Sequence, residues 1–159
     1  FSAGITLHKT HVPVDKMAAG AEAALEAAKG YEGKNAVTMF GCTVSWPEFV
    51  ALLDNRAAMQ GWLDDRHLTS SMMYRFNRFI DMAGREKLVR EQETIHVEDL
   101  ECLKWRAMFA YSLNRNLNRA LRDQERTRAL QEIGVLAGWL EQYGSALRVP
   151  LWHLLYDQR

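Results

Sequence analysis

Two kinds of hydrophobic pattern follow one another along this chain of 159 residues. The first part contains two short, apolar, β-prone runs at residues 1–7 and 35–40, and the segment between them has helical periodicity from Val14. Two strands separated by one helix are typical of a β-α-β unit. After Ser45 the apolar residues recur at intervals of three and four, which predicts helices alone.

The turn into the second predicted strand is rich in glycine. The alanine-rich helical segment ends at Lys29, and Gly30 stops it. Gly33 and Lys34 then form the predicted turn, and residues 41–45 are expected to link the strand to the helices.

A helix-start signal opens the second part. Ser45 and Glu48 have the spacing of a capping box, and Pro47 lies in the first turn. We therefore expect a small α+β domain at residues 1–44 and an all-α helical bundle at residues 45–159.

The bundle is predicted from five helical segments joined by short links. Gly144 ends the fourth segment, and Ser145 is expected to cap the last one. Residues 84–96 are charged and lack periodicity, which predicts an exposed loop. The other predicted segments are residues 46–63, 69–83, 98–122 and 124–143.

Two strands and one helix do not make a self-sufficient sheet. Such a unit leaves strand edges unpaired and one face uncovered, so we expect further strands from residues outside this chain or from a partner. Gly4, inside the first strand, indicates a bulge or a close backbone approach.

Composition narrows the class of protein. The 20 basic and 20 acidic residues cancel, so any attraction to nucleic acid must come from local patches. Cys42 and Cys102 have no CxxC spacing, which favours a reducing, cytoplasmic setting. No apolar run approaches about 18 residues, so we expect no membrane partner.

Catalytic and metal-binding motifs are not apparent. Asp15, Glu22 and Glu26 share one helix face opposite the apolar residues, as on a solvated surface. The five histidines have no ligand spacing, and the sequence contains no HExxH, P-loop, GxGxxG or GxSxG pattern. We therefore predict no metal site in this chain.

Two lysines are candidates for phosphate binding. Lys29 ends a helix and Lys34 lies in the turn before a strand, so both ammonium groups can reach a phosphate. The alternative is that Lys29 only complements the helix dipole and that Lys34 is an exposed turn residue.

The strongest local charge is a row of arginines near residue 120. Lys104–Arg128 carries seven basic and two acidic residues, a net charge of 7 − 2 = +5. If one helix continues past Asp123, four of the arginines share a face that suits a nucleic-acid backbone, although a solvated bundle face is the alternative. These four are Arg115, Arg119, Arg122 and Arg126.

Several short passages resemble one protein family. They are Ser2-Ala3-Gly4-Ile5, Ala28-Lys29, Gly33-Lys34-Asn35-Ala36-Val37-Thr38 and Ser45-Trp46, and, near the end, Arg148-Val149-Pro150-Leu151 and Leu155-Tyr156. In these the chain resembles the C-terminal portion of the large signature subunit of type III CRISPR effector complexes (the Csm/Cmr large subunit, Cas ten). The resemblance is specific over Lys29–Trp46 and loose through the predicted bundle.

The resemblance implies an RNA-guided antiviral effector. Such subunits join ATP into cyclic oligoadenylate when guide RNA pairs with target RNA, and many members also cut single-stranded DNA. Their partners are the guide RNA, the target RNA and the backbone, small and guide-end subunits of the complex. Residues 1–44 would be the last β-α-β of a ferredoxin-like, GGDEF-like palm, and residues 45–159 the C-terminal helical domain.

The resemblance also assigns roles to the candidate residues. Lys29 and Lys34 would contact ATP phosphates, and the arginine row would contact RNA or a neighbouring subunit. The family's Gly-Gly-Asp-Asp hairpin, which holds two Mg or Mn ions, is not in this sequence. This segment therefore lacks the catalytic acids, which would lie outside it.

Two other functions remain open at this point. One is a nucleotide cyclase related to diguanylate cyclases, and the other is a helical subunit that binds RNA or protein. For the CRISPR interpretation we expect the bundle to move with the RNA and to pull on the palm through Gly41–Ser45.

Overall fold

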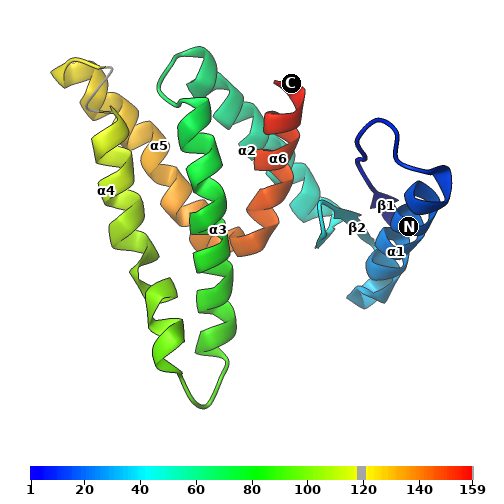
Figure 1. Ribbon diagram of the computed structural model, residues 1–159. Coiled ribbons are helices and arrows are strands. Elements are labelled where there is room, and N and C mark those ends of the chain that lie inside the picture. The colour runs from blue at the N-terminus through cyan, green and yellow to red at the C-terminus, as the bar shows by residue number, and fades with distance from the viewer. Residues whose placement is uncertain (118–120, 159) are drawn as a thin grey trace.

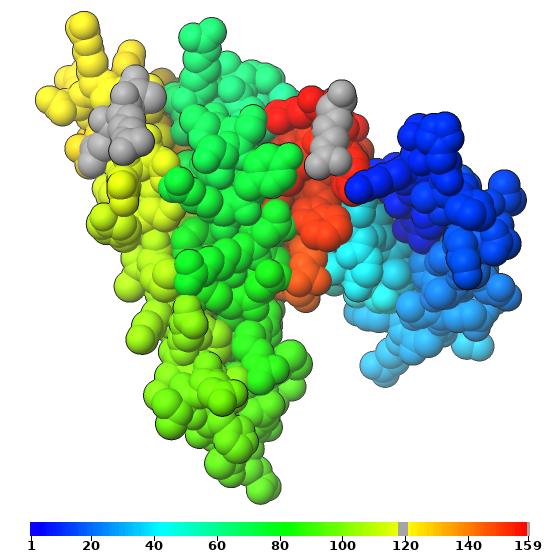
Figure 2. Space-filling model, viewed as in Figure 1, coloured from blue at the N-terminus to red at the C-terminus, as the bar shows by residue number. Residues whose placement is uncertain are grey.

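A computed structural model describes residues 1–117 and 121–158. The described chain is mostly helical, with a small three-stranded mixed sheet at its start (Figure 1). The sheet and helix α1 stand to one side of the remaining helices (Figure 2). The elements are β1 (Ala3–Ile5), α1 (Val14–Gly30), η1 (Glu32–Lys34), β2 (Ala36–Met39), β3 (Cys42–Ser45), α2 (Trp46–Asp64), α3 (Ser70–Arg90), η2 (Val97–Lys104), α4 (Trp105–Leu117), α5 (Asp123–Tyr143), η3 (Gly144–Leu147) and α6 (Arg148–Asp157), where η denotes a 3-10 helix.

The predicted β-α-β unit is confirmed. Strand β1 pairs in parallel with β2, with Gly4 opposite Thr38, and α1 connects the two. The predicted close approach at Gly4 is also confirmed, because a Cβ atom there would lie 2.3 Å from the backbone nitrogen of Leu25 in α1. A glycine at this position lets the helix pack directly on the strand.

The expectation of a linker at Gly41–Ser45 is wrong, because residues 42–45 form the third strand. Strand β3 pairs antiparallel to β2 through a two-residue turn. Phe40 and Gly41 form this turn with φ values of 52° and 74°, and positive φ at both positions is the type I′ geometry that matches the twist of a hairpin. A strand of four residues is too short to give a clear alternating pattern in the sequence.

One face of the sheet packs on α1 and the other on the bundle. Gly4 and Thr38 face α1, whereas Val37 and Val44 belong to the same hydrophobic core as the helices. The expectation of an uncovered face is therefore wrong for β2 and β3. Among the described residues, strand β1 has a neighbour on one side only, and Ile5 on it is 40% exposed.

The helix start at Ser45 is confirmed. The Ser45 hydroxyl accepts a hydrogen bond from the Glu48 backbone nitrogen at 3.3 Å, and Pro47 lies in the first turn of α2. Helix α3 has a cap of the same kind, in which the Thr69 hydroxyl accepts from the backbone nitrogen of Met72 at 3.3 Å. Both helices thus begin where a side chain satisfies a free backbone N–H group.

The predicted loop at residues 84–96 is wrong over its first half. Helix α3 continues through Gly84 to Arg90, and η2 begins at Val97. Glu86 and Val89 in this stretch are buried, at helical spacing from the buried Ala83 just before it. The periodicity is hidden in the sequence because one of its inward positions is a glutamate.

The predicted helix at residues 98–122 is divided. Its first part is η2, its second is α4, and Arg122 already has an extended backbone with φ −82° and ψ 162° before α5 begins. The predicted stop at Gly144 is confirmed, with φ 53°. Ser145 does not cap the last helix; it lies inside η3, where no side-chain cap forms.

The core runs without interruption from the sheet into the bundle. Val37, Cys42 and Val44 share it with fully buried residues such as Leu52, Trp105 and other residues of α2–α6. The Cys42 thiol donates to the Ser145 carbonyl at 3.2 Å, which ties β3 to η3. Among the described helices, none has the length and hydrophobicity needed to cross a bilayer.

Candidate functional site

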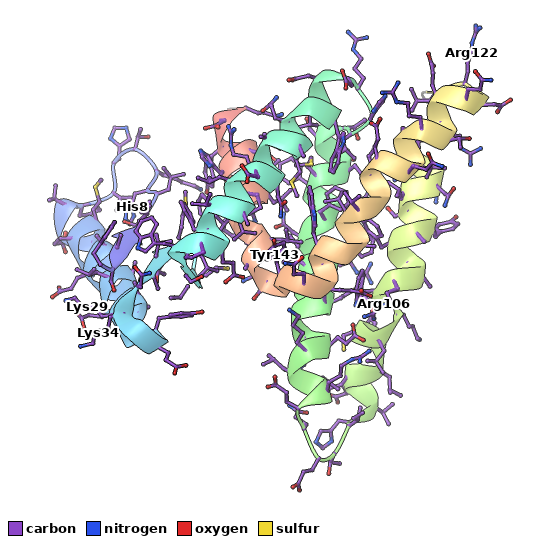
Figure 3. The ribbon with its side chains drawn as sticks, turned by 180° about the vertical axis from the view of Figure 1, so that it is seen from behind. His8, Lys29, Lys34, Arg106, Arg122 and Tyr143 are labelled. Carbon is purple, nitrogen blue, oxygen red and sulfur yellow. The ribbon has the colours of Figure 1, made fainter. Side chains whose placement is uncertain are left out.

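Lys29 and Lys34 lie at the same end of α1, as the view in Figure 3 shows. The Lys29 ammonium donates to Glu26 at 2.8 Å, and both side chains are about half exposed or more. The Lys34 backbone nitrogen donates to the Tyr31 carbonyl at 2.9 Å, and its carbonyl accepts from the Ser2 hydroxyl at 2.7 Å. The turn is therefore fixed, while both ammonium groups remain accessible to a ligand.

This turn suits a compact anion. Lys34 has no carboxylate partner in the part of the chain that the structure describes, and an exposed pair such as Lys29–Glu26 is worth only about 0–1 kcal/mol. A phosphate can therefore replace Glu26 at little cost. The helix dipole opposes this, because the C-terminal end of α1 carries partial negative charge. Any binding here depends on the two lysines.

Metal ligands do not gather in the described chain. Across residues 1–117 and 121–158, no three His, Cys, Asp or Glu side chains come together as they would around an ion. His8, shown in Figure 3 away from the lysine turn, shares a hydrogen bond of 3.1 Å with the Thr6 hydroxyl. Cys42 and Cys102 are buried free thiols, and burial raises the pKa of both.

The arginine row does not lie on one helix. Arg115 belongs to α4, Arg122 precedes α5 with an extended backbone, and Arg126 lies in the first turn of α5. Arg119 is outside the described residues. The end of α4 and the start of α5 are nevertheless neighbours, since Arg126 donates to the Asn114 side-chain oxygen at 3.5 Å. Because Arg115 and Arg126 lie on two different helices, the expectation of one continuous face is wrong.

Two of the basic residues in this segment pair with acids that are distant in the sequence or on the next turn. Arg106 contacts Glu86 on α3 and Glu141 on α5, each at 2.7 Å. Arg128 pairs with Glu132 at 2.9 Å. The net charge of a sequence segment does not include the acidic partners that other helices supply.

Glu86 is a buried anion with several donors. Its carboxylate accepts from the Trp105 indole at 2.5 Å, from Arg90 at 2.8 Å and from Arg106 at 2.7 Å. The Arg106 guanidinium also stacks 4.5 Å above the Trp105 ring. Burial alone raises the pKa of the Glu86 carboxyl, but the bonds from Trp105, Arg90 and Arg106 and the charge of Arg106 outweigh it and lower that pKa. This arrangement fixes α3 against α4.

A basic groove lies between α3 and α4, and the sequence alone did not reveal it. Arg75 and Arg78 on α3 and Tyr111 and Arg115 on α4 line a hollow of about 360 Å³, together with Phe79, Met108 and Ser112. Arg75 and Arg78 are three residues apart on α3, and Tyr111 and Arg115 are four residues apart on α4. Each pair therefore lies on one side of its own helix. Their convergence depends on the pairing of the two helices, which the sequence pattern did not specify.

A second hollow is lined by the sheet, α1 and α6. It has a volume of about 460 Å³, with Thr38 and Thr43 on the sheet and Trp152 on α6 in its wall. The two threonine hydroxyls share a hydrogen bond of 2.8 Å. Phe40 stacks on Tyr156 with ring centroids 5.7 Å apart, so aromatic packing joins the β2–β3 turn to α6.

Comparisons with protein-family models, curated proteins and solved structures gave no match.

Proposed function

We propose that this chain is the C-terminal part of a type III CRISPR large subunit. Residues 1–44 would complete an ATP-binding palm, and residues 45–159 would form the helical domain that responds to RNA. The observation that carries the proposal is the turn between α1 and β2, where the passage of closest resemblance places two accessible lysines at one end of α1 (Figure 3).

Within the intact subunit, ATP would be joined into cyclic oligoadenylate by chemistry that two Mg or Mn ions supply. The described part of this chain has no carboxylate cluster that fits such ions, so their ligands would lie in residues outside it. Lys29 and Lys34 offer two exposed ammonium groups to the triphosphate of ATP. Lys29 and Lys34 would bind and orient it through charge-assisted hydrogen bonds.

RNA binding would be coupled to the palm through packed contacts. Strand β3 is tied to η3 by the bond from Cys42 to Ser145, and the Phe40 turn packs on α6. A displacement of the helices therefore has a rigid route to the sheet. These contacts add to the route through Gly41–Ser45 that the sequence suggested.

The alternative of a helical binding subunit is favoured by one observation. The basic groove between α3 and α4 is independent of the lysine turn and needs no nucleotide chemistry. The diguanylate-cyclase alternative has no such support, because those enzymes are not expected to carry this bundle.

The two lysines give the test of the proposal. The full-length subunit, assembled with guide RNA, is supplied with target RNA, ATP and Mg or Mn, and oligoadenylate formation is measured. Lys29→Ala and Lys34→Ala should each raise the KM for ATP about tenfold, since a hydrogen bond to a charged group is worth about 1.5–3 kcal/mol. Lys16→Ala, an exposed lysine near the other end of α1, is the matched control. A KM unchanged in both test variants would remove the lysine turn from the ATP site.

A further inference from the structure

Three guanidinium groups line the basic groove, defined by Arg75, Arg78, Tyr111 and Arg115. Its volume of about 360 Å³ lies near the small end of ligand clefts, which span about 300–1,000 Å³. Its basic residues belong to the first half of α3 and the second half of α4, so the groove lies where α3 begins and α4 ends. A hollow of about 360 Å³ has room for about one nucleotide unit of an extended ligand.

The positive charge of the groove is largely available. Arg78 pairs with Glu101 at 2.9 Å, but the two side chains are 59% and 69% exposed, so the pair is weak and exchangeable. Arg75 and Arg115 have no carboxylate partner among residues 1–117 and 121–158. No acidic residue lines the hollow. An anionic ligand would meet three cations there.

An exposed aromatic ring adjoins these cations. Tyr111 is 66% exposed, while Phe79 below the groove is buried. Guanidinium planes and tyrosine rings both offer flat surfaces on which an unstacked base can lie. An acidic peptide would use the arginines but gain little from the ring, and a duplex keeps its bases stacked inside. The combination favours a single strand of nucleic acid.

We propose that the basic groove binds single-stranded RNA, with phosphates on Arg75, Arg78 and Arg115 and one base stacked on Tyr111. The choice of RNA rests on the proposed function, whereas the groove itself rests on its charge and its exposed ring. Arg126, which reaches Asn114 near the end of α4, extends the basic surface toward α5.

The first test measures binding of a fluorescently labelled, unstructured RNA strand to the full chain by anisotropy at several salt concentrations. Arg75→Gln combined with Arg115→Gln should make the slope of log K against log salt shallower by about 1.4, since each phosphate contact to a single strand contributes about 0.7. Arg128→Gln removes an exposed arginine that does not line the groove, and should leave the slope unchanged. An unchanged slope in the double variant would overturn the proposal.

The second test concerns the ring. Tyr111→Ala should weaken RNA binding by roughly 5- to 100-fold, while Tyr111→Phe should retain it, because stacking needs the ring and not the hydroxyl. Thermal unfolding of each variant checks that the fold is kept. Equal affinity of the alanine and phenylalanine variants would contradict the stacking, and a preference for DNA of the same sequence would contradict the choice of RNA.

Two further outcomes separate this proposal from the proposed function. RNA binding that depends on the groove, in a full-length subunit that makes no oligoadenylate, would support the groove and refute the nucleotide chemistry. Groove variants that bind RNA normally but fail to associate with the other subunits would overturn the RNA proposal and make the groove a protein interface.

Discussion

Glu86 shows how one residue can determine both the stability and the pH response of this protein. The carboxylate is 4% exposed and is held by donors from Trp105, Arg90 and Arg106. Removing the negative charge weakens the bonds from these donors, and a hydrogen bond to a charged group is worth about 1.5–3 kcal/mol. The two guanidinium groups are 67% and 43% exposed, so water solvates them once the anion is gone.

Glu86→Gln should therefore lower the free energy of unfolding by about 1.5–3 kcal/mol at neutral pH. Because the pKa of Glu86 is lowered in the folded protein, its stabilising effect is complete above the ordinary pKa of 4.5 and is lost as the pH falls through the folded value. Urea unfolding between pH 7 and pH 3 measures this. The variant should lose less stability than the wild type on acidification, and an identical pH dependence would contradict the role of Glu86.

Gly4 is the residue at which the sheet and α1 come closest. A side chain there would meet backbone atoms of Leu25, Ala24 and Ala21 within 2.9 Å, and backbone cannot move aside as a flexible side chain does. Gly4→Ala should lower stability by about 1–3 kcal/mol or more. Gly138→Ala is the matched control, since no atom lies within 4 Å of its added Cβ, and this change should raise stability by about 0.5–1 kcal/mol. Equal effects in thermal unfolding would contradict the close approach.

At the scale of elements, the β2–β3 hairpin and α6 are joined by aromatic rings. Phe40 packs on Trp152 and Tyr156 at centroid distances of 5.6 and 5.7 Å, and it does so from a left-handed backbone. Asparagine tolerates this backbone better than phenylalanine but has no ring.

Phe40→Asn should therefore keep the turn and loosen its contact with α6. We expect faster hydrogen exchange at the amides of β2 and β3, by about fivefold for a loss of about 1 kcal/mol, with α4 and α5 unchanged. The amides of α4 serve as the internal control. Wild-type exchange in the hairpin would show that the rings do not hold the two elements together.

The sequence predicted elements well where local signals were strong. Capping at Ser45, the stop at Gly144 and the contact at Gly4 were all confirmed, because each depends on a residue with one dominant local use. The end of α3 was missed, because the buried charge of Glu86 breaks the apolar period. Strand β3 was missed because four residues are too few to show alternation.

The candidate sites differ in how far sequence could place them. Lys29 and Lys34 are close along the chain, so their common location follows from the turn. The basic groove needs Arg75 and Arg115 to meet across two helices, and the partners of Arg106 come from α3 and α5. Such contacts depend on tertiary packing, which a single sequence does not specify.

At the scale of the whole molecule, the small mixed sheet and the helices share one hydrophobic core. Val37 and Val44 are buried in the same cluster as the bundle residues, so the predicted division at residue 45 does not separate two independent cores. In the proposed function, binding at the helices would be transmitted to the lysine turn through this core. This is the physical basis of the proposed response to RNA.

Synthesis of oligoadenylate in response to RNA is the most direct test of the account. The full-length subunit is assembled with guide RNA and incubated with ATP and Mg or Mn, with and without matching target RNA, and the products are separated by chromatography. The account predicts cyclic oligoadenylate that forms only when target RNA is present and that decreases in the Lys29→Ala, Lys34→Ala double variant. Absence of product in the fully assembled wild-type complex, or equal product without target RNA, would contradict it.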